Sequence, residues 1–214
     1  MRRFAVVAAV IAWAALALRL CMDIYWSVAQ GIGVPYGLAK FFTAFTTLAN
    51  ILVGGILTAS AMRTESKLCR FLRQPSVMGC AATYISVMAG VFVLLLAPHA
   101  TSVGINRVAG GFLHGVTPAL YLSYWLFFAP KRRLRTRHAF GWTVWAAAYF
   151  VLILIRGAVT GVYPYPFVDV GKLGYPRVTL NATILYGVFV VVGLLFVAID
   201  QWAPWDTSAG HEGR

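Results

Sequence analysis

Charged residues are scarce in this sequence, and acidic residues are the scarcest of all. Asp and Glu together number 6 among 214 residues, and charged residues of all kinds make up 11% of the chain. Soluble domains carry about a quarter, so this shortage, together with 60% hydrophobic residues and a mean hydropathy of +0.77, excludes an ordinary soluble protein. We expect a chain built for lipid, with one membrane domain over 1–202 and a short, polar, disordered tail over 203–214.

Ligands for metals and redox cofactors are also few. The three cysteines, Cys21, Cys69 and Cys80, form no CxxC pair and no other metal-binding spacing, and we interpret them as packing residues. One histidine, His114, falls within an apolar run. One histidine cannot supply a bis-histidine haem, and no carboxylate lies beside it for a zinc site. The sequence therefore predicts neither a cofactor nor a metal.

The net charge of +12 does not indicate a nucleic-acid partner. The sequence has no module that combines aromatic and basic residues, and its lysines and arginines form short clusters between apolar runs. Such clusters are typical of cytoplasmic loops in membrane proteins. We therefore expect no nucleic acid among its partners.

Six apolar runs reach the length of about 20 residues that a helix needs to cross a bilayer. They cover 4–22, 41–62, 77–98, 108–129, 140–160 and 177–199. Of the 18 Lys and Arg, 12 fall on the side that holds both termini and 6 on the other. Because cytoplasmic loops carry the positive excess, the sequence predicts an all-α polytopic membrane protein, a bundle of six transmembrane helices with the N and C termini cytoplasmic.

The first run allows a second interpretation. "MRRFAVVAAVIAWAALA" has the charged start, apolar centre and small-residue end of a signal peptide, and its removal would leave five spans. We favour a retained helix, because the apolar run continues past Ala17 to a membrane-spanning length.

A polar stripe interrupts the second run. In "FFTAFTTLAN", residues 41–50, the polar residues Thr43, Thr46, Thr47 and Asn50 are spaced i, i+3, i+4 and i+7. On one continuous helix this spacing puts all four side chains on the same face. The stripe lies near the outer end of the predicted span.

Three other spans place polar side chains at a similar depth. At a rise of 1.5 Å per residue, Thr46 and His114 each lie about 9 Å from the outer ends of their spans, while Arg156 lies about 7 Å and Asn181 about 6 Å from theirs. Ionisable groups inside a membrane usually face the bundle interior and by default indicate a functional site. The predicted layer therefore occupies the outer leaflet.

The layer has the groups for ester chemistry. A threonine hydroxyl becomes a nucleophile when a base accepts its proton, and a neutral imidazole is the usual base, so Thr46 and His114 are the candidate pair. Asn50 would orient His114 or donate to a developing oxyanion, and Arg156 would grip a substrate carboxylate. The structural alternative is that threonine and asparagine hold helices together, that His114 is a satisfied core residue and that Arg156 reaches the headgroups.

The segment after the fifth run, "RGAVTGVYPYPFVDV", is rich in aromatic residues and proline. Pro164 and Pro166 favour extended backbone, and Tyr163, Tyr165 and Phe167 are typical of the membrane interface. The segment is either a lid over the outer leaflet or an aromatic anchor. Its one acidic residue, Asp169, is a further candidate for substrate binding.

The elements "FTTLAN", "LHGVTP", "PKRRLR" and "RGAVTGVYPYPFVDV" occur in an order that resembles the bacterial Pr-six-Pr membrane proteins. These are similar to the androgen-induced protein and androgen-dependent TFPI-regulating protein family of animals. The resemblance covers about 40–200, and its most specific part is the T-G-x-x-Y-P-F-type element. It implies a multi-pass hydrolase of fatty acid esters of hydroxy fatty acids in the bacterial cytoplasmic membrane. By position, Thr46 would be the nucleophile and His114 the base, with Thr43 or Thr47 taking the place of Thr46 if the register shifts.

Three functions are therefore open. The first is a lipid ester hydrolase with a membrane lipid or fatty acid ester as its partner, in which Asn50, Arg156, Asp169 and Asn181 line the substrate site. The second is a small transporter or lipid-binding protein, although the sequence has neither internal repeats nor a polar path through both leaflets. The third is a structural or partner-binding protein whose polar layer only packs helices.

Overall fold

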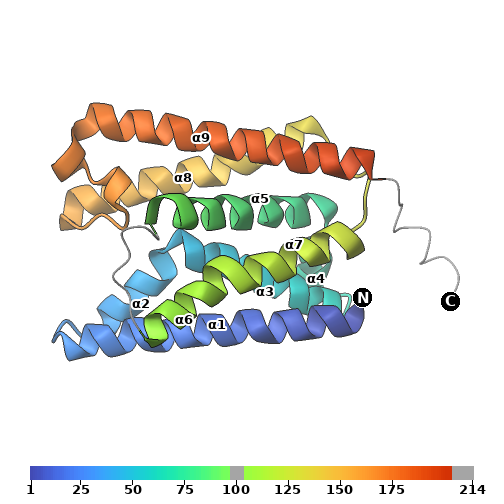
Figure 1. Cartoon of the computed structure of the whole chain (residues 1–214), viewed down its shortest axis with the longest axis horizontal. Coiled ribbons are helices and arrows are strands. Elements are labelled where there is room, and N and C mark those ends of the chain that lie inside the picture. The colour runs from blue at the N-terminus through green and yellow to red at the C-terminus, as the bar shows by residue number, and fades with distance from the viewer. Residues whose placement is uncertain (97–103, 204–214) are drawn as a thin grey trace, which may run out of the picture.

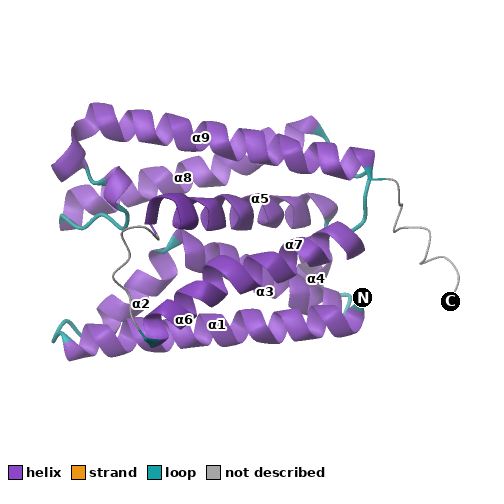
Figure 2. Cartoon of the chain, viewed as in Figure 1, coloured by secondary structure: helices purple, strands orange, loops and turns teal. Residues whose placement is uncertain are grey.

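The apolar runs of the sequence form helices in the computed structural model, which describes residues 1–96 and 104–203. This part of the chain is all-helical and contains no strand, which confirms the all-α part of the predicted fold class (Figure 2). The elements run in the order α1 (Arg2–Ala29), α2 (Val34–Thr43), α3 (Phe45–Ala61), α4 (Lys67–Leu72), α5 (Pro75–Val91), η1 (Phe92–Leu96), α6 (Ile105–Gly111), η3 (Phe112–Val116), α7 (Thr117–Phe128), α8 (Thr136–Thr160), η4 (Pro166–Val168) and α9 (Val170–Trp202). The predicted tail lies, apart from residue 203, outside the described residues.

The long helices lie along one axis, and α1 begins at the same end of the bundle at which α9 ends (Figure 1). The connections α3–α5 and α7–α8 share that end, whereas α1–α2 and α8–α9 join at the opposite end. We call these the terminal end and the opposite end. Helix α1 packs on α2 and α3, and α9 packs on α8 and α5.

Four helical stretches are long and apolar enough to cross a membrane: α1, Pro75–Leu96, α8 and α9. The bent pair α2 and α3 forms a fifth if it is counted as one span. The chain is thus a multi-pass membrane protein by the length and composition of its helices. The segment 105–128, which corresponds to the fourth predicted run, is helical but is not among these candidates. The count of six spans therefore stays a prediction.

The second predicted run is not one straight helix. Helices α2 and α3 meet at Ala44, which has an extended backbone (φ −80°, ψ 128°), and their axes differ by 70°. Tyrosine hydroxyls replace the missing helical hydrogen bonds, because the Phe45 N–H donates to Tyr149 and Tyr165 and the Tyr149 hydroxyl donates to the Thr43 carbonyl. The prediction that Thr43 shares one helical face with the other three polar residues is therefore wrong.

An aromatic cluster fills the bundle next to the break at Ala44. Phe45 at the start of α3 contacts Tyr84, Trp145, Tyr149 and Phe189, with ring centroids 5.2–5.8 Å apart. These rings come from α3, α5, α8 and α9, so four helices are fixed around the first residue of α3. The residue that follows, Thr46, is held in place by this packing.

The helices on either side of the undescribed segment 97–103 each contain a π-helical turn. These turns, η1 and η3, are five residues long. Phe92, the first residue of η1, stacks on His114 in the middle of η3 with 3.7 Å between ring centroids and 9° between planes. Single π-helical turns are frequent at functional sites, because they redirect side chains from the regular helical positions.

At the terminal end, buried charges hold the chain together. Asp200 of α9 is 1% exposed, and its Oδ2 accepts hydrogen bonds from the N–H groups of Arg133 (2.9 Å) and Leu134 (2.7 Å). Lys131 is fully buried, with its Nζ donating to the carbonyls of Trp125 and Ala129. Burial lowers the pKa of Lys131 to about 8, and the nearby Asp200 carboxylate only partly opposes this shift.

Candidate functional site

The break at Ala44 places the N-terminus of α3 inside the bundle, near its opposite end (Figure 1). No side chain caps this helix, although the hydroxyls of Tyr149 and Tyr165 accept from its first N–H. Thr46 lies in this first turn, where the partial positive charge of the helix dipole is concentrated. Its side chain is half-buried, whereas the next residue, Thr47, is only 2% exposed.

His114 approaches the same region from η3. One face of its ring is covered by Phe92, and its Nδ1 atom is buried without a hydrogen-bond partner in the described part of the chain. Buried polar atoms are rarely left unpartnered. Among the described residues, the Nδ1 atom of His114 therefore lacks the hydrogen bond that a histidine with a purely structural role would form.

Thr46 and His114 both line two cavities that meet between them. One is apolar and runs among α3, α5, α8 and α9, where Met88, Ile153 and Phe189 form part of its wall. The other is a cleft of about 350 Å³ near the opposite end with both polar and apolar lining, and we call it the polar cleft because Arg19, Lys40 and Arg156 line it. The residues common to both are Thr46, Leu96, His114 and Tyr165. The two candidate catalytic side chains therefore lie at the boundary of an apolar and a polar space.

The two side chains share these cavities without touching through a hydrogen bond. None joins the Thr46 hydroxyl to either ring nitrogen of His114 within residues 1–96 and 104–203. The Thr46 side chain instead lies within interaction distance of the Tyr165 hydroxyl. Catalytic hydrogen bonds are often long in the absence of substrate. The lack of a hydrogen bond between Thr46 and His114 is therefore compatible with a catalytic pair.

Arg156 reaches the polar cleft from α8. Its Nη1 donates to the Thr43 hydroxyl, which in turn donates to the carbonyl of Ala39 at 2.6 Å. Arg156 lines the cleft together with Thr46 and His114, so three of the six predicted site residues come together. Thr43 is committed to these two contacts and lies outside the apolar cavity, which makes it a poorer candidate nucleophile than Thr46.

The other three predicted residues connect parts of the fold. Asn50 is fully buried, and its Nδ2 donates to the carbonyls of Thr46 (2.9 Å) and Leu113 (3.3 Å). Asn181 donates to the carbonyl of Phe167 at 2.8 Å, and Asp169 caps the start of α9 by accepting from the Lys172 N–H. None of the three lines either cavity. Asn50 nevertheless connects the backbone of Thr46 to the residue that precedes His114.

The segment after α8 turns its aromatic rings into the bundle. Tyr165 and Phe167 stack at 5.3 Å and line the apolar cavity, and Tyr165 also lines the polar cleft. Tyr163 packs so closely on Gly157 that a Cβ there would lie 2.0 Å from its ring. Two aromatic residues of the segment therefore form part of the cavity walls, and its aromatic residues contact protein rather than only the membrane interface.

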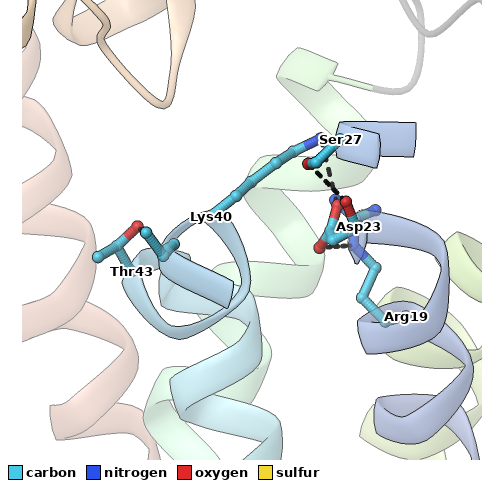
Figure 3. A network of polar contacts seen from close by, with 6 residues as sticks. Arg19, Asp23, Ser27, Lys40 and Thr43 are labelled. Carbon is cyan, nitrogen blue, oxygen red and sulfur yellow. Dashed lines mark hydrogen bonds and ion pairs between the residues drawn. The ribbon is translucent and has the colours of Figure 1, made fainter. Parts of the chain in front are cut away.

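Sequence reasoning missed a charged group at the opposite end. Asp23 of α1 is 4% exposed and forms ion pairs with Arg19 (2.8 Å) and with Lys40 of α2 (3.2 Å), as Figure 3 shows. Both cations line the polar cleft. The available signal was the i, i+4 spacing of Arg19 and Asp23 within an apolar run, since such a pair lies on one helical face.

The chemistry of the candidate site depends on the protein groups that line it. Among the described residues, no three His, Cys, Asp or Glu side chains gather as they would around a metal ion. The groups available for chemistry thus include the hydroxyls of Thr46 and Tyr165, the imidazole of His114, several arginines and lysines, and the N–H groups at the start of α3.

Comparison of the chain with protein-family models, with curated proteins and with solved structures found no match.

Proposed function

We propose that this protein is an integral membrane hydrolase of lipid esters, with Thr46 as the nucleophile and His114 as the base. The observation that carries the proposal is the position of these two side chains, which come from different helices and line both the apolar cavity and the polar cleft where the two meet. An ester that joins an acyl chain to an anionic group would present its carbonyl at that boundary.

The topology completes the proposal. We propose six spans with both termini in the cytoplasm, because the terminal end carries the basic loops of the chain and cytoplasmic loops carry the positive excess. The site then lies in the outer leaflet of the membrane. The resemblance to the bacterial Pr-six-Pr proteins favours the cytoplasmic membrane of a bacterium.

The reaction would proceed in two halves. The Thr46 hydroxyl oxygen attacks the ester carbonyl carbon while its proton passes to a ring nitrogen of His114. The bond between the carbonyl carbon and the alcohol oxygen then breaks, and the alcohol leaves with that proton. In the second half, His114 accepts a proton from water, the resulting hydroxide attacks the acyl-threonine, and the fatty acid leaves as Thr46 regains its proton.

The start of α3 would stabilise the negative oxygen that forms during each attack. Helix N-termini present N–H groups and a partial positive charge to anions, and Thr46 lies in the first turn of this helix. The Tyr165 hydroxyl, which lies beside Thr46, is a second donor within reach. Neither donor requires a metal or a cofactor.

The substrate would bind with its two chemically different parts in different spaces. The acyl chain enters the apolar cavity, whose wall is formed by residues such as Val87, Met88 and Phe189. The anionic end of the substrate extends from the apolar cavity into the polar cleft, where Arg156 has guanidinium N–H groups beyond the one that contacts Thr43. Membrane lipids and fatty acid esters have this division of charge.

Covalent labelling tests the proposal. A fluorophosphonate with a long alkyl chain should label the purified protein, and Thr46→Ala should abolish the label. Thr183→Ala is the matched control, because Thr183 is exposed on α9 and lines neither cavity. Labelling that survives Thr46→Ala, or a folded wild-type protein that takes no label, would overturn the proposed mechanism.

A lipid-binding protein without chemistry is the second candidate. It is favoured by the absence of a hydrogen bond between Thr46 and His114 in the described part of the chain, since the amphipathic cavities alone suit a lipid. On this alternative the protein binds fatty acid esters and releases them intact. Mass spectrometry of the lipid after incubation separates the two candidates.

A further inference from the structure

A third cavity, of about 710 Å³, is lined by Phe92 and His114, and it shares His114 with the apolar cavity. It shares Arg19, Lys40 and His114 with the polar cleft, so the two polar spaces adjoin. Its volume is within the range of sites that hold small molecules. We call it the basic cavity.

The charges that line the basic cavity are unbalanced. Arg19, Lys40 and Arg107 contribute three positive charges, and Asp23 contributes one negative charge. Of the described residues, none forms an ion pair with Arg107. A cavity with a formal charge of about +2 attracts an anion, and the attraction is stronger at a membrane boundary than in open water.

The cations are held in place before any ligand arrives. Asp23 is almost completely buried and binds the Arg19 guanidinium through both carboxylate oxygens, at 2.8 and 3.0 Å, while Lys40 reaches the same carboxylate from α2 (Figure 3). Helix α2 can approach because Gly37 has no side chain, since a Cβ there would lie 2.8 Å from the Asp23 carbonyl. Preorganised cations bind an anion with a smaller loss of side-chain entropy.

We propose that the basic cavity binds the phosphate monoester of a lipid, and therefore that the substrates of the proposed hydrolase are acyl esters of lipid phosphates. A phosphate monoester carries about −1.5 to −2 charges near neutral pH, which matches the excess of the cavity, whereas a carboxylate carries only one. The second part of this inference rests on the proposed function. The first part, phosphate binding, is independent of it.

The neutral groups of the cavity suit the same ligand. Trp26, Gln30 and Asn106 line it and have N–H donors for phosphate or glycerol oxygens. His114 lines the basic cavity, the polar cleft and the apolar cavity. A lipid with its phosphate in the basic cavity and its chain in the apolar cavity would therefore pass the candidate base.

Binding is tested with ligands that contain no ester bond. The protein carries Thr46→Ala and is held in a neutral detergent at pH 8, and affinities are measured for dodecyl phosphate, dodecanoate and inorganic phosphate. We expect dodecyl phosphate to bind at least about tenfold more tightly than dodecanoate, because a second charge adds charge-assisted hydrogen bonds. Equal binding of the two chain-bearing ligands would overturn the assignment of phosphate.

Inorganic phosphate separates a lipid source from a free one. If the ligand is a lipid, inorganic phosphate binds much more weakly than dodecyl phosphate, since it leaves the apolar cavity empty. Inorganic phosphate that binds as tightly as dodecyl phosphate would overturn the lipid assignment.

Arg107→Gln is the decisive variant, because this side chain has no ion pair to lose among the described residues. It should lower the affinity for dodecyl phosphate about tenfold and leave that for dodecanoate within about twofold. Arg177→Gln is the matched control, since Arg177 is exposed in the first part of α9, a helix that begins at the opposite end (Figure 1), and lines none of the three cavities. Equal losses in the two variants would overturn the site, and thermal melting of both shows that they are folded.

These results are separable from the proposed function. A protein that takes the fluorophosphonate label on Thr46 but shows no preference for dodecyl phosphate keeps the hydrolase proposal and loses this inference. A protein that prefers dodecyl phosphate but takes no label keeps the phosphate site and loses the hydrolase.

Discussion

The two ends of the bundle use buried polar groups in different ways. At the terminal end, Asp200 accepts from two backbone N–H groups and Lys131 is enclosed by carbonyls, so these charges hold the connection α7–α8 against α9. At the opposite end, Thr46, His114 and Arg156 border cavities. Polar groups in a membrane protein therefore indicate a site when they face a cavity, and a structural role when backbone groups engage them.

The largest expected effect separates activity from stability at His114. His114→Leu should reduce hydrolysis by about a thousandfold or more, since the base is lost. The melting temperature should not fall, because the replacement removes a buried Nδ1 that has no partner. Kinetic measurements with a fatty acid ester check the loss of hydrolysis, and thermal melting in detergent checks the melting temperature. A large loss of stability would show that His114 is a structural residue.

Asp169, which caps the start of α9, and Asp200, near its end, form the next test of the comparison. Asp200→Ala should lower the free energy of unfolding by about 3 kcal/mol, because two backbone N–H groups lose their acceptor in a buried place. Asp169→Ala removes a helix cap and an ion pair with the exposed Lys172, and should cost about 1 kcal/mol, because exposed ion pairs contribute little. Equal losses, measured by denaturation in mixed micelles, would contradict the assigned difference between the ends.

Arg156 should affect substrate use more than stability. Arg156→Gln should lower kcat/KM for an anionic ester about tenfold and leave a neutral ester of the same chain length nearly unchanged. The comparison of the two esters is the control within one variant. A similar loss with both esters would indicate that Arg156 acts through its contact with Thr43 and not on the substrate.

The last expected effect is a pH dependence at the terminal end. The pKa of Lys131 in the folded protein is about 8, below the ordinary value of 10.5, so the unfolded chain binds more protons between these values. Stability should therefore rise with pH through this range, and this rise should be smaller in Lys131→Met. Melting curves from pH 7.5 to 10 measure the difference. Parallel curves for the two proteins would contradict the lowered pKa.

The sequence was sufficient for the helices, because a membrane-spanning helix is specified by local composition. It was not sufficient for the break at Ala44, since the hydroxyls that replace the helical hydrogen bonds belong to Tyr149 and Tyr165, more than 100 residues away. The candidates Thr46, His114 and Arg156 were chosen for their side-chain chemistry and their similar depth, and a similar depth indicates a layer but not a distance.

The rest of the site depends on contacts that no local pattern contains. The ion pair of Lys40 with Asp23 joins two helices, and the π-helical turn that directs His114 toward Phe92 has no sequence signal that we can name. The sequence likewise indicated a polar contact for Asn50, but it did not indicate its partners, which are the backbone carbonyls of Thr46 and Leu113. Long-range packing decided the Lys40–Asp23 ion pair, the stacking of His114 on Phe92 and the contact of Asn50 with Leu113, whereas the contact of Asn50 with Thr46 lies within one helix.

The most direct test of the central claim is to locate the covalent adduct. Wild-type protein labelled with an alkyl fluorophosphonate is digested, and the modified residue is identified by mass spectrometry. The account predicts one adduct, on the hydroxyl of Thr46, that is strongly reduced in His114→Leu. An adduct on Thr43, on Thr47 or on any other residue, or labelling that is independent of His114, would contradict the pairing of Thr46 with His114.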